Sequence, residues 1–245
     1  MFQTQRTPEG MCCTFNNYAL KNRVFSGYMA ERYKPYPRKL ASCGKQSGLT
    51  VVLHINPSDY LVSELSAYGA KILVHDSYNY PDWSAQRVLI TMMRHMYVDV
   101  NPFKTYATDD VRAMSVEKRG CVFTNERKLA LYSNYSYENC LAECRIRILE
   151  KLCNCMPFYL RNEWASWYRP LRVCDLRDIH CISANKQRFM SSVPGYDPYE
   201  TKGTYHVWGS EKSDCHCLPD CESRVYIVHS TYAILAVEGP NRRFL

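Results

Sequence analysis

Cysteine is the residue type in this 245-residue chain whose number and spacing point most clearly to chemistry. Ten of the thirteen cysteines lie in the second half: Cys121, Cys140, Cys144, Cys153, Cys155, Cys174, Cys181, Cys215, Cys217 and Cys221. Two pairs have the spacing C-x-C, and such cysteines in extended chain point to opposite sides, so they rarely bond each other. Each needs a distant partner, and the pattern therefore predicts a segment cross-linked along its length.

Zinc binding and thiol catalysis fit the spacing less well than disulfides. Structural zinc sites usually combine pairs spaced C-x2-C to C-x4-C; C-x2-C does not occur here, and although Cys217 and Cys221 could chelate, the C-x-C pairs fit poorly. A catalytic cysteine needs a neighbouring histidine, but His216, set between two bridged cysteines, is better interpreted as a surface side chain. Disulfides are favoured, and they indicate an oxidising compartment.

Other patterns give no support for an enzyme. The G-x-S-x-G, P-loop, H-E-x-x-H and Rossmann motifs do not occur, and the pair Asp109-Asp110 is interpreted as a solvated turn. The net charge of +7 arises from scattered basic residues, which is typical of a solvated surface and not of a nucleic-acid site. We predict no catalytic residue, no metal, no cofactor and no nucleic-acid partner.

The two ends of the chain lack the signals that its cysteines would require. The first ten residues are polar and do not resemble a signal peptide, and the best apolar run, Val225 to Val237, is too short to span a membrane. A cysteine-rich chain without a route into the secretory pathway is best explained as a fragment of a longer protein. The single permitted sequon makes Asn134 the candidate glycosylation site.

The elements that position the cysteines follow from hydrophobic periodicity. The clearest is a helix from Tyr137 to Leu152, with Ser136 as its N-cap. Its predicted buried stripe consists of Leu141, Cys144, Ile148 and Leu152, with Arg145, Arg147, Glu150 and Lys151 mostly on other faces.

Strands are predicted from alternation in three other segments. They are Leu49 to Ile55, Ala70 to His75 and Arg224 to Val237, the last with a turn allowed near His229. Residues 1–48 are predicted to be irregular, Gln86 to Val98 strand or helix, Asn101 to Glu117 loop and strand, and Asn185 to Gly209 loop with a weak helix. Strands followed by a cross-linked helical hairpin and a returning strand predict an α+β fold.

Two sets of residues resemble the degenerin/epithelial sodium channel family. The first is Gly10-Met11-Cys12-Cys13-Thr14-Phe15-Asn16, which resembles the G-x-C-x-T-F-N signature through Gly10, Cys12, Thr14, Phe15 and Asn16. The second is the ten-cysteine array, with C-N-C-M-P at 153–157 and C-H-C-L-P-x-C at 215–221. Arg119-Gly120-Cys121 with Phe123 and Glu126 is similar to the arthropod pickpocket branch. Together the matches span nearly the whole chain.

The resemblance implies a specific disulfide pairing. The implied pairs are Cys121 with Cys221, Cys140 with Cys217, Cys144 with Cys215, Cys153 with Cys181, and Cys155 with Cys174. It also implies that the partner of Cys12 lies upstream of this chain, which leaves Cys12 unpaired. Cys13 and Cys43 have no assigned partner, and a bridge between them is a hypothesis.

The resemblance further implies a division of the chain into parts. Residues 1–48 would hold the end of the finger and the first palm strand region, 49–120 the palm and β-ball strands, 121–221 the disulfide-rich helical thumb, and 222–245 a truncated returning palm strand. The membrane helices are missing, and Gly209-Ser210-Glu211 lies in a polar loop and is not the selectivity filter. This chain alone would not conduct ions.

We therefore expect part of the extracellular domain of a trimeric, amiloride-sensitive sodium channel subunit of the plasma membrane. Its partners would be sodium ions, other channel subunits and the membrane, and this part would act as a ligand-driven or mechanically driven gating lever. The stretch Ile182 to Arg188 has no acidic residue, so gating by paired carboxylates is not expected. The family tryptophan before Cys121 is also missing. The alternative is a secreted cysteine-rich binding module.

Overall fold

The computed structural model describes residues 2–20, 36–44, 46–61, 67–83, 85–160, 172–190 and 215–235. The chain divides into two compact units, each assembled from separate stretches. The first comprises Met1–Pro37, Asp76–Ser84 and Lys104–Arg224, and the second comprises Arg38–His75, Ala85–Phe103 and Val225–Leu245. Helices and strands are both present, which confirms the mixed content predicted from the sequence.

The first unit begins with a hairpin that the sequence prediction missed. Strands β1 (Gln3–Thr7) and β2 (Gly10–Thr14) pair antiparallel, with Thr7 opposite Gly10, whose φ of +116° suits only glycine. The residues that this hairpin buries are polar, so hydrophobic alternation could not reveal it. Asn17 Nδ2 donates to Gln5 Oε1 at 2.9 Å, and Thr7 Oγ1 donates to the Gly10 carbonyl at 3.0 Å.

Helix α3 (Tyr137–Cys153) is the longest helix of the first unit and confirms the strongest sequence prediction. Ser136 Oγ accepts a hydrogen bond from the Asn139 amide at 3.1 Å, as an N-cap does, and Asn154 ends the helix at φ +49°. The predicted buried stripe was wrong at Leu152, which is 40% exposed, and Arg145 is buried instead. An ion pair with Asp82 neutralises the charge of that guanidinium, so the buried face of the helix is wider and more polar than periodicity alone predicts.

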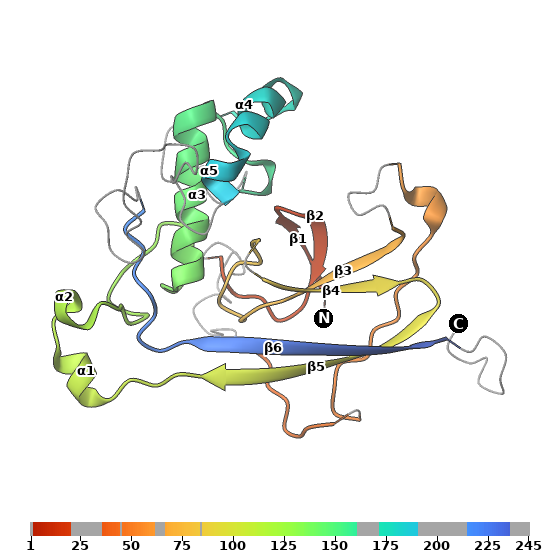
Figure 1. Ribbon diagram of the computed structural model, residues 1–245, viewed down its shortest axis with the longest axis horizontal. Coiled ribbons are helices and arrows are strands. Elements are labelled where there is room, and N and C mark those ends of the chain that lie inside the picture. Colours follow the sequence, from red (N-terminus) through yellow and green to blue (C-terminus); the bar gives the residue numbers. More distant parts are fainter. Residues whose placement is uncertain are drawn as a thin grey trace, which may run out of the picture. The chain divides into compact units, whose positions relative to one another are not determined.

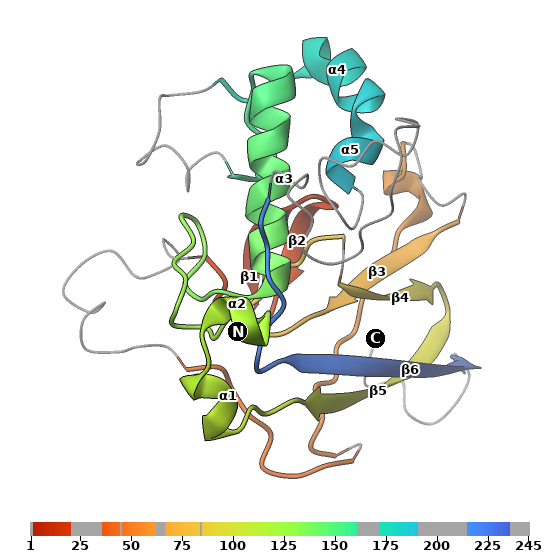
Figure 2. The ribbon, with the colours of Figure 1, turned by 60° about the vertical axis from the view of Figure 1, so that its left-hand side comes forward.

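Shorter helices precede and follow α3. The predicted loop and strand from Asn101 to Glu117 is correct at its start, where residues 101–104 are strand and 105–108 are irregular, but it is wrong from residue 109 on. There the chain forms helices α1 (Asp109–Ala113) and α2 (Val116–Arg119). Asp109 and Asp110 lie in the first turn of α1, where the helix dipole favours acidic side chains. Two 3-10 turns, η3 (Phe158–Leu160) and η4 (Leu176–Asp178), lead to α4 (Ile179–Ala184) and α5 (Lys186–Met190). Figures 1 and 2 show α4 and α5 lying along α3, and Phe189 of α5 joins a buried cluster with Ile148 and Leu149. The rest of the predicted stretch Asn185 to Gly209 lies beyond the described residues.

In the part of the second unit that the structure describes, the strands form two antiparallel pairs. Strand β3 (Gly69–Val74) pairs with β4 (Gln86–Thr91), and β5 (Arg94–Lys104) pairs with β6 (Arg224–Ile234), which runs the opposite way in Figure 1. The ambiguous stretch from Gln86 to Val98 is therefore strand on both sides of a turn, where Met93 has φ +55°. Strand β6 passes through His229 without a turn, and the end of its predicted range, after residue 235, lies beyond the described residues.

One predicted strand is wrong. Residues 49–55 form no strand, although their alternation was regular, and Val52 is 72% exposed. A strand is held by hydrogen bonds to a neighbour, and within the described residues this segment has none; a short turn, η2 (Pro57–Asp59), follows it. Among the described helices, none combines the length and the apolar character that a membrane span requires.

Candidate functional site

Five disulfides cross-link residues 121–221, which we call the cystine-linked region. They join Cys121 to Cys221, Cys140 to Cys217, Cys144 to Cys215, Cys153 to Cys181 and Cys155 to Cys174, with Cα–Cα distances from 4.9 to 5.8 Å. These are the same five pairs that the family resemblance implies. The first three are nested, so they fasten the 215–221 segment along the first half of α3 and close the region at its base.

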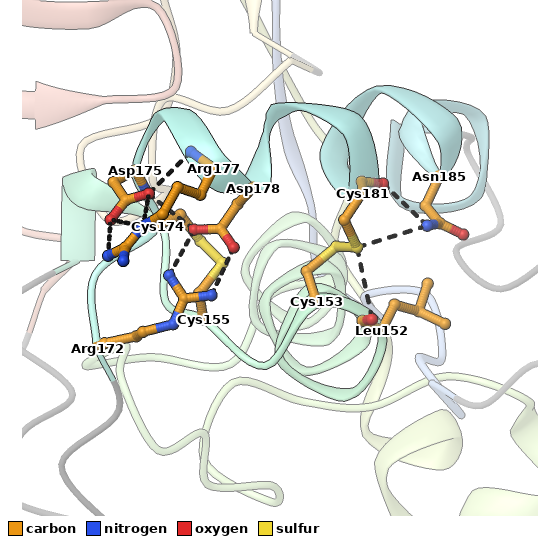
Figure 3. Close-up of a disulfide and its surroundings, with 10 residues drawn as sticks. All are labelled: Leu152, Cys153, Cys155, Arg172, Cys174, Asp175, Arg177, Asp178, Cys181 and Asn185. Atoms are coloured by element: carbon orange, nitrogen blue, oxygen red, sulfur yellow. Dashed lines mark hydrogen bonds and ion pairs between the residues drawn. A yellow bond between two sulfur atoms is a disulfide. The ribbon is translucent and has the colours of Figure 1, made fainter.

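The last two bridges fasten the end of α3 to the segment that contains η4 and α4 (Figure 3). Beside them, Arg172 donates to both carboxylate oxygens of Asp178 at 2.7 and 2.5 Å, and this pairing lowers the pKa of Asp178. The sulfurs of Cys155 and Cys174 lie close to that carboxylate. Because the two sulfurs are bonded to each other and the carboxylate is paired, this group of three is not a metal site.

A half-buried carboxylate supports the beginning of α3. Both oxygens of Asp220, in the C-H-C-L-P-D-C segment, accept from the Tyr137 amide at 3.1 and 3.2 Å. Burial raises the pKa of Asp220 to about 6, against the opposing effect of that hydrogen bond, and the nearby Glu138 adds to the rise. Burial also raises the pKa of Glu138, whose Oε2 accepts from Asn79 at 2.8 Å. Two carboxyl groups with raised pKa values therefore adjoin the same helix end.

The loop formed by residues 76–83, which connects β3 to β4, is held against α3 by hydrogen bonds. Asn139 of α3 has no exposed surface, and both the oxygen and the nitrogen of its side-chain amide form hydrogen bonds with the loop. Its Oδ1 accepts from the Tyr80 amide at 2.9 Å, and its Nδ2 donates to the Tyr78 carbonyl at 2.9 Å. Asn139 thus binds the backbone of this loop as a neighbouring strand would.

Charge and aromatic contacts extend this attachment along the helix. Arg145 forms an ion pair with Asp82, and the two side chains are 6% and 3% exposed. The Arg145 guanidinium also lies 5.8 Å from the Trp83 ring, and that ring is 6.3 Å from Phe189 of α5. A buried pair in which each charge neutralises the other fixes geometry more strongly than an exposed pair. The 76–83 loop and α3 are therefore joined over two turns of the helix.

The residues that resemble the pickpocket branch form one connected structure. Arg119 pairs with Glu126, which also accepts from the Phe123 amide at 2.9 Å, and these hydrogen bonds lower the pKa of Glu126. The Arg119 guanidinium lies 4.8 Å from the Phe123 ring. Gly120 ends α2 in the left-handed conformation, at φ +65°. These residues therefore shape the turn after α2 that places Cys121 where it bonds to Cys221.

The remaining sequence-derived site residues lie elsewhere in the first and second units. Cys12, Cys13 and Cys43 are free thiols, so the hypothetical Cys13–Cys43 bridge is not formed, and Cys12 Sγ lies 3.2 Å from Thr7 Oγ1. In the signature, Asn16 takes a left-handed φ of +60° and the Phe15 ring lies 5.7 Å from Phe2. Asn134 is half-buried, and its carbonyl accepts from Asn139. Its glycosylation remains a prediction.

Sequence reasoning missed the side chains that attach the 76–83 loop. Asp82, Asn139 and Arg145 are polar residues in an ordinary loop and a helix, and nothing in their spacing indicates bonds between residues 59 to 63 positions apart. Asp220 was visible only as the variable position of the C-x-C-L-P-x-C pattern. The one available signal was Arg145, a charged residue four positions after Leu141 and therefore on the same side of the helix as the predicted buried stripe.

Comparison with known proteins identifies the class. The chain matches the family described as amiloride-sensitive sodium channel over residues 1–244, and it belongs to that family. This confirms the resemblance and favours the channel hypothesis over the secreted module.

Three relatives illustrate the similarity. Sodium channel protein Nach of Drosophila ananassae is 27% identical over 228 residues, 93% of this chain and 38% of that protein. Pickpocket protein 11 of Drosophila melanogaster is 28% identical over 216 residues, 88% of this chain and 33% of that protein. Sodium channel protein Nach of Drosophila melanogaster is 26% identical over 247 residues, 98% of this chain and 42% of that protein. The chain spans from a third to about two fifths of the length of these relatives.

Proposed function

We propose that this chain is the extracellular sensing and gating part of a sodium channel subunit of the plasma membrane. The observation that carries the proposal is the family match over residues 1–244, in a chain whose cysteines are bridged in the family's order. In the whole protein, membrane helices would supply the sodium pathway, and further subunits, of the same or another kind, would complete a trimer.

In this proposal residues 121–221 are the thumb, and the strands around them belong to the palm and β-ball. Strand β5 leads into the cystine-linked region and β6 leads out of it. The chain is closed between them twice, by the Cys121–Cys221 bridge and by the hydrogen bond from the Thr105 amide to the Ser223 carbonyl at 2.9 Å. A force on this region therefore reaches both strands through one covalently closed base.

The 76–83 loop is a second connection between the cystine-linked region, which would act as the gating lever, and the strands. It is bonded to α3 through Asn139 and Arg145, and its two ends continue directly into β3 and β4. A displacement of α3 would pull on both of these strands through the backbone. The stimulus we favour is a ligand or a mechanical force, because residues 182–188 carry no carboxylate that could sense protons.

The proposal is tested by recording from the complete subunit in oocytes, alone and together with pickpocket-type subunits. We expect a sodium current that amiloride blocks and that is lost when sodium is replaced by a large organic cation. Replacing both Cys121 and Cys221 by serine should alter gating without altering ion selectivity, because the bridge lies outside the pore. A subunit that reaches the surface in every combination but carries no such current under peptide, shear or acid stimulation would refute the proposal.

A further inference from the structure

Four cationic side chains surround a hollow on the cystine-linked region. Arg127 and Lys128 come from the segment before α3, and Arg147 and Lys151 from successive turns of α3. The hollow has a volume of about 210 Å³, and the Cys144–Cys215 bridge also lines it. The two sources of positive charge are separate in sequence, and the fold brings them together.

The positive charge in this hollow is in excess. Glu143 is the only acid among the described residues that line it, and it is 3% exposed. Its Oε2 accepts from the amides of Ala130 and Leu131 at 2.8 and 3.2 Å, and its Oε1 accepts from Arg147 at 2.5 Å. One acid against four cations leaves an excess of three positive charges.

One of the four cationic side chains is held in place by contacts within the protein, and two others are exposed and available to a ligand. Arg127 Nη1 donates to the His216 carbonyl at 2.6 Å, and its guanidinium lies 5.7 Å from the Tyr135 ring, so this cation is held in place. Lys128 and Lys151 are exposed and form no ion pair within the described part of the chain. A ligand would therefore meet fixed and mobile cations together, which lowers the entropy cost of binding.

We propose that this hollow binds a compact polyanion, meaning a small ligand with several negative oxygens close together, as in a tricarboxylate or an oligophosphate. Clustered charge is required because a single carboxylate would neutralise only part of the excess. The site is distinct from the attachment of the 76–83 loop: Arg145 and Arg147 are two positions apart, so they point to different sides of α3. The proposal does not rest on a sodium current.

The test is titration calorimetry of the complete, detergent-solubilised subunit with citrate and, separately, inorganic tripolyphosphate at low ionic strength. We expect saturable binding of at least one probe, weakening as salt is added. The better-bound probe identifies carboxylate or phosphate as the preferred group. Because binding is read directly, failure here is distinguishable from failure of the channel proposal.

The decisive comparison is between the wild type and the double variant Lys128→Gln/Lys151→Gln. Joint neutralisation of the two lysines should weaken binding about tenfold, since each exposed cation contributes a modest amount, and the fold should survive because both side chains lie at the surface. Lys118→Gln, an exposed lysine of α2 that does not line the hollow, is the matched control and should change affinity less than twofold. No binding of either probe, or equal weakening by the control, would overturn the proposal.

Discussion

Asn139 is a buried polar residue whose side chain is placed to form hydrogen bonds with the backbone of the 76–83 loop. Its amide satisfies a backbone donor and a backbone acceptor of the 76–83 loop, which would otherwise be left unpaired in the interior. Buried backbone groups are almost always paired because desolvation without a partner is costly. A leucine at this position could not form these two hydrogen bonds with the loop.

Replacing Asn139 by alanine should therefore destabilise the protein by about 2–3 kcal/mol, because it leaves the Tyr80 amide and the Tyr78 carbonyl without their partner. Chemical denaturation of the purified protein measures the change. Asn125→Ala, at an exposed position, is the control and should alter stability by less than about 0.5 kcal/mol. Equal effects of the two substitutions would show that the Asn139 bonds contribute nothing.

Because the pKa of Asp220 is raised in the folded protein, its contribution to the free energy of unfolding falls as the pH rises. Its pKa in the folded protein, about 6, lies above its ordinary value of 3.8, so the folded state holds the proton more tightly than the unfolded state. The stabilising contribution is complete below about pH 4 and is lost as the pH rises to about 6. Unfolding of the wild type and of Asp220→Asn across this window should show the wild type losing stability relative to the variant as pH rises. A constant difference would contradict a raised pKa.

At the scale of elements, α3 combines a strong local signal with long-range contacts. Its N-cap and the helical spacing of its apolar residues are local signals, and from them the sequence correctly predicted Ser136 as the N-cap and a helix over nearly this range. Its buried charges Glu143 and Arg145 depend on partners outside the helix, so the sequence placed Arg145 on the wrong face. The same contrast explains residues 49–55, whose alternation is local but whose strand would need a neighbour that the described structure does not provide.

The buried pair between Asp82 and Arg145 should show strong coupling. Asp82→Asn leaves a buried guanidinium without its counter-charge and should cost about 3–5 kcal/mol. The double variant Asp82→Asn with Arg145→Met should cost less than the sum of the single substitutions, because it removes both charges. Denaturation of the four proteins measures this coupling. The exposed pair Arg112–Glu222 is the control, with an expected coupling below about 1 kcal/mol; similar coupling in both pairs would refute the structural role of burial.

At the scale of the whole molecule, covalent cross-links do much of what a large core would do elsewhere. Buried clusters lie on both sides of α3, yet the cystine-linked region is also closed by five bridges. The separation between Cys121 and Cys221 is 100 residues, compared with 19 between Cys155 and Cys174. Longer loops lose more entropy when closed. With the Cys140–Cys217 bridge in place, the outer bridge closes only the loop formed by residues 121–140 and 217–221. That loop is still longer than the one that the Cys155–Cys174 bridge closes inside the Cys153–Cys181 loop, so the outer bridge constrains the unfolded chain more.

Disulfide mapping by partial reduction and mass spectrometry should recover the five pairs and no bridge among Cys12, Cys13 and Cys43. Replacing both Cys121 and Cys221 by serine should destabilise the protein by about 2–5 kcal/mol. The loss should exceed that from replacing both Cys155 and Cys174 by serine, because the Cys121–Cys221 bridge closes the longer loop. The ordering of the two thermal shifts is the measurement. A larger loss from the short loop would argue against the entropic explanation.

The family, the cross-linked character of residues 121–221 and the extent of α3 could all be predicted from the amino-acid sequence. These follow from signals carried by neighbouring residues, namely cysteine spacing, capping and helix periodicity. The polar hairpin β1–β2, the attachment of the 76–83 loop to α3 and the meeting of four cations in one hollow became visible only in the folded protein. Those features depend on contacts between residues many positions apart, whose energies appear only when the backbone has folded and water has been excluded.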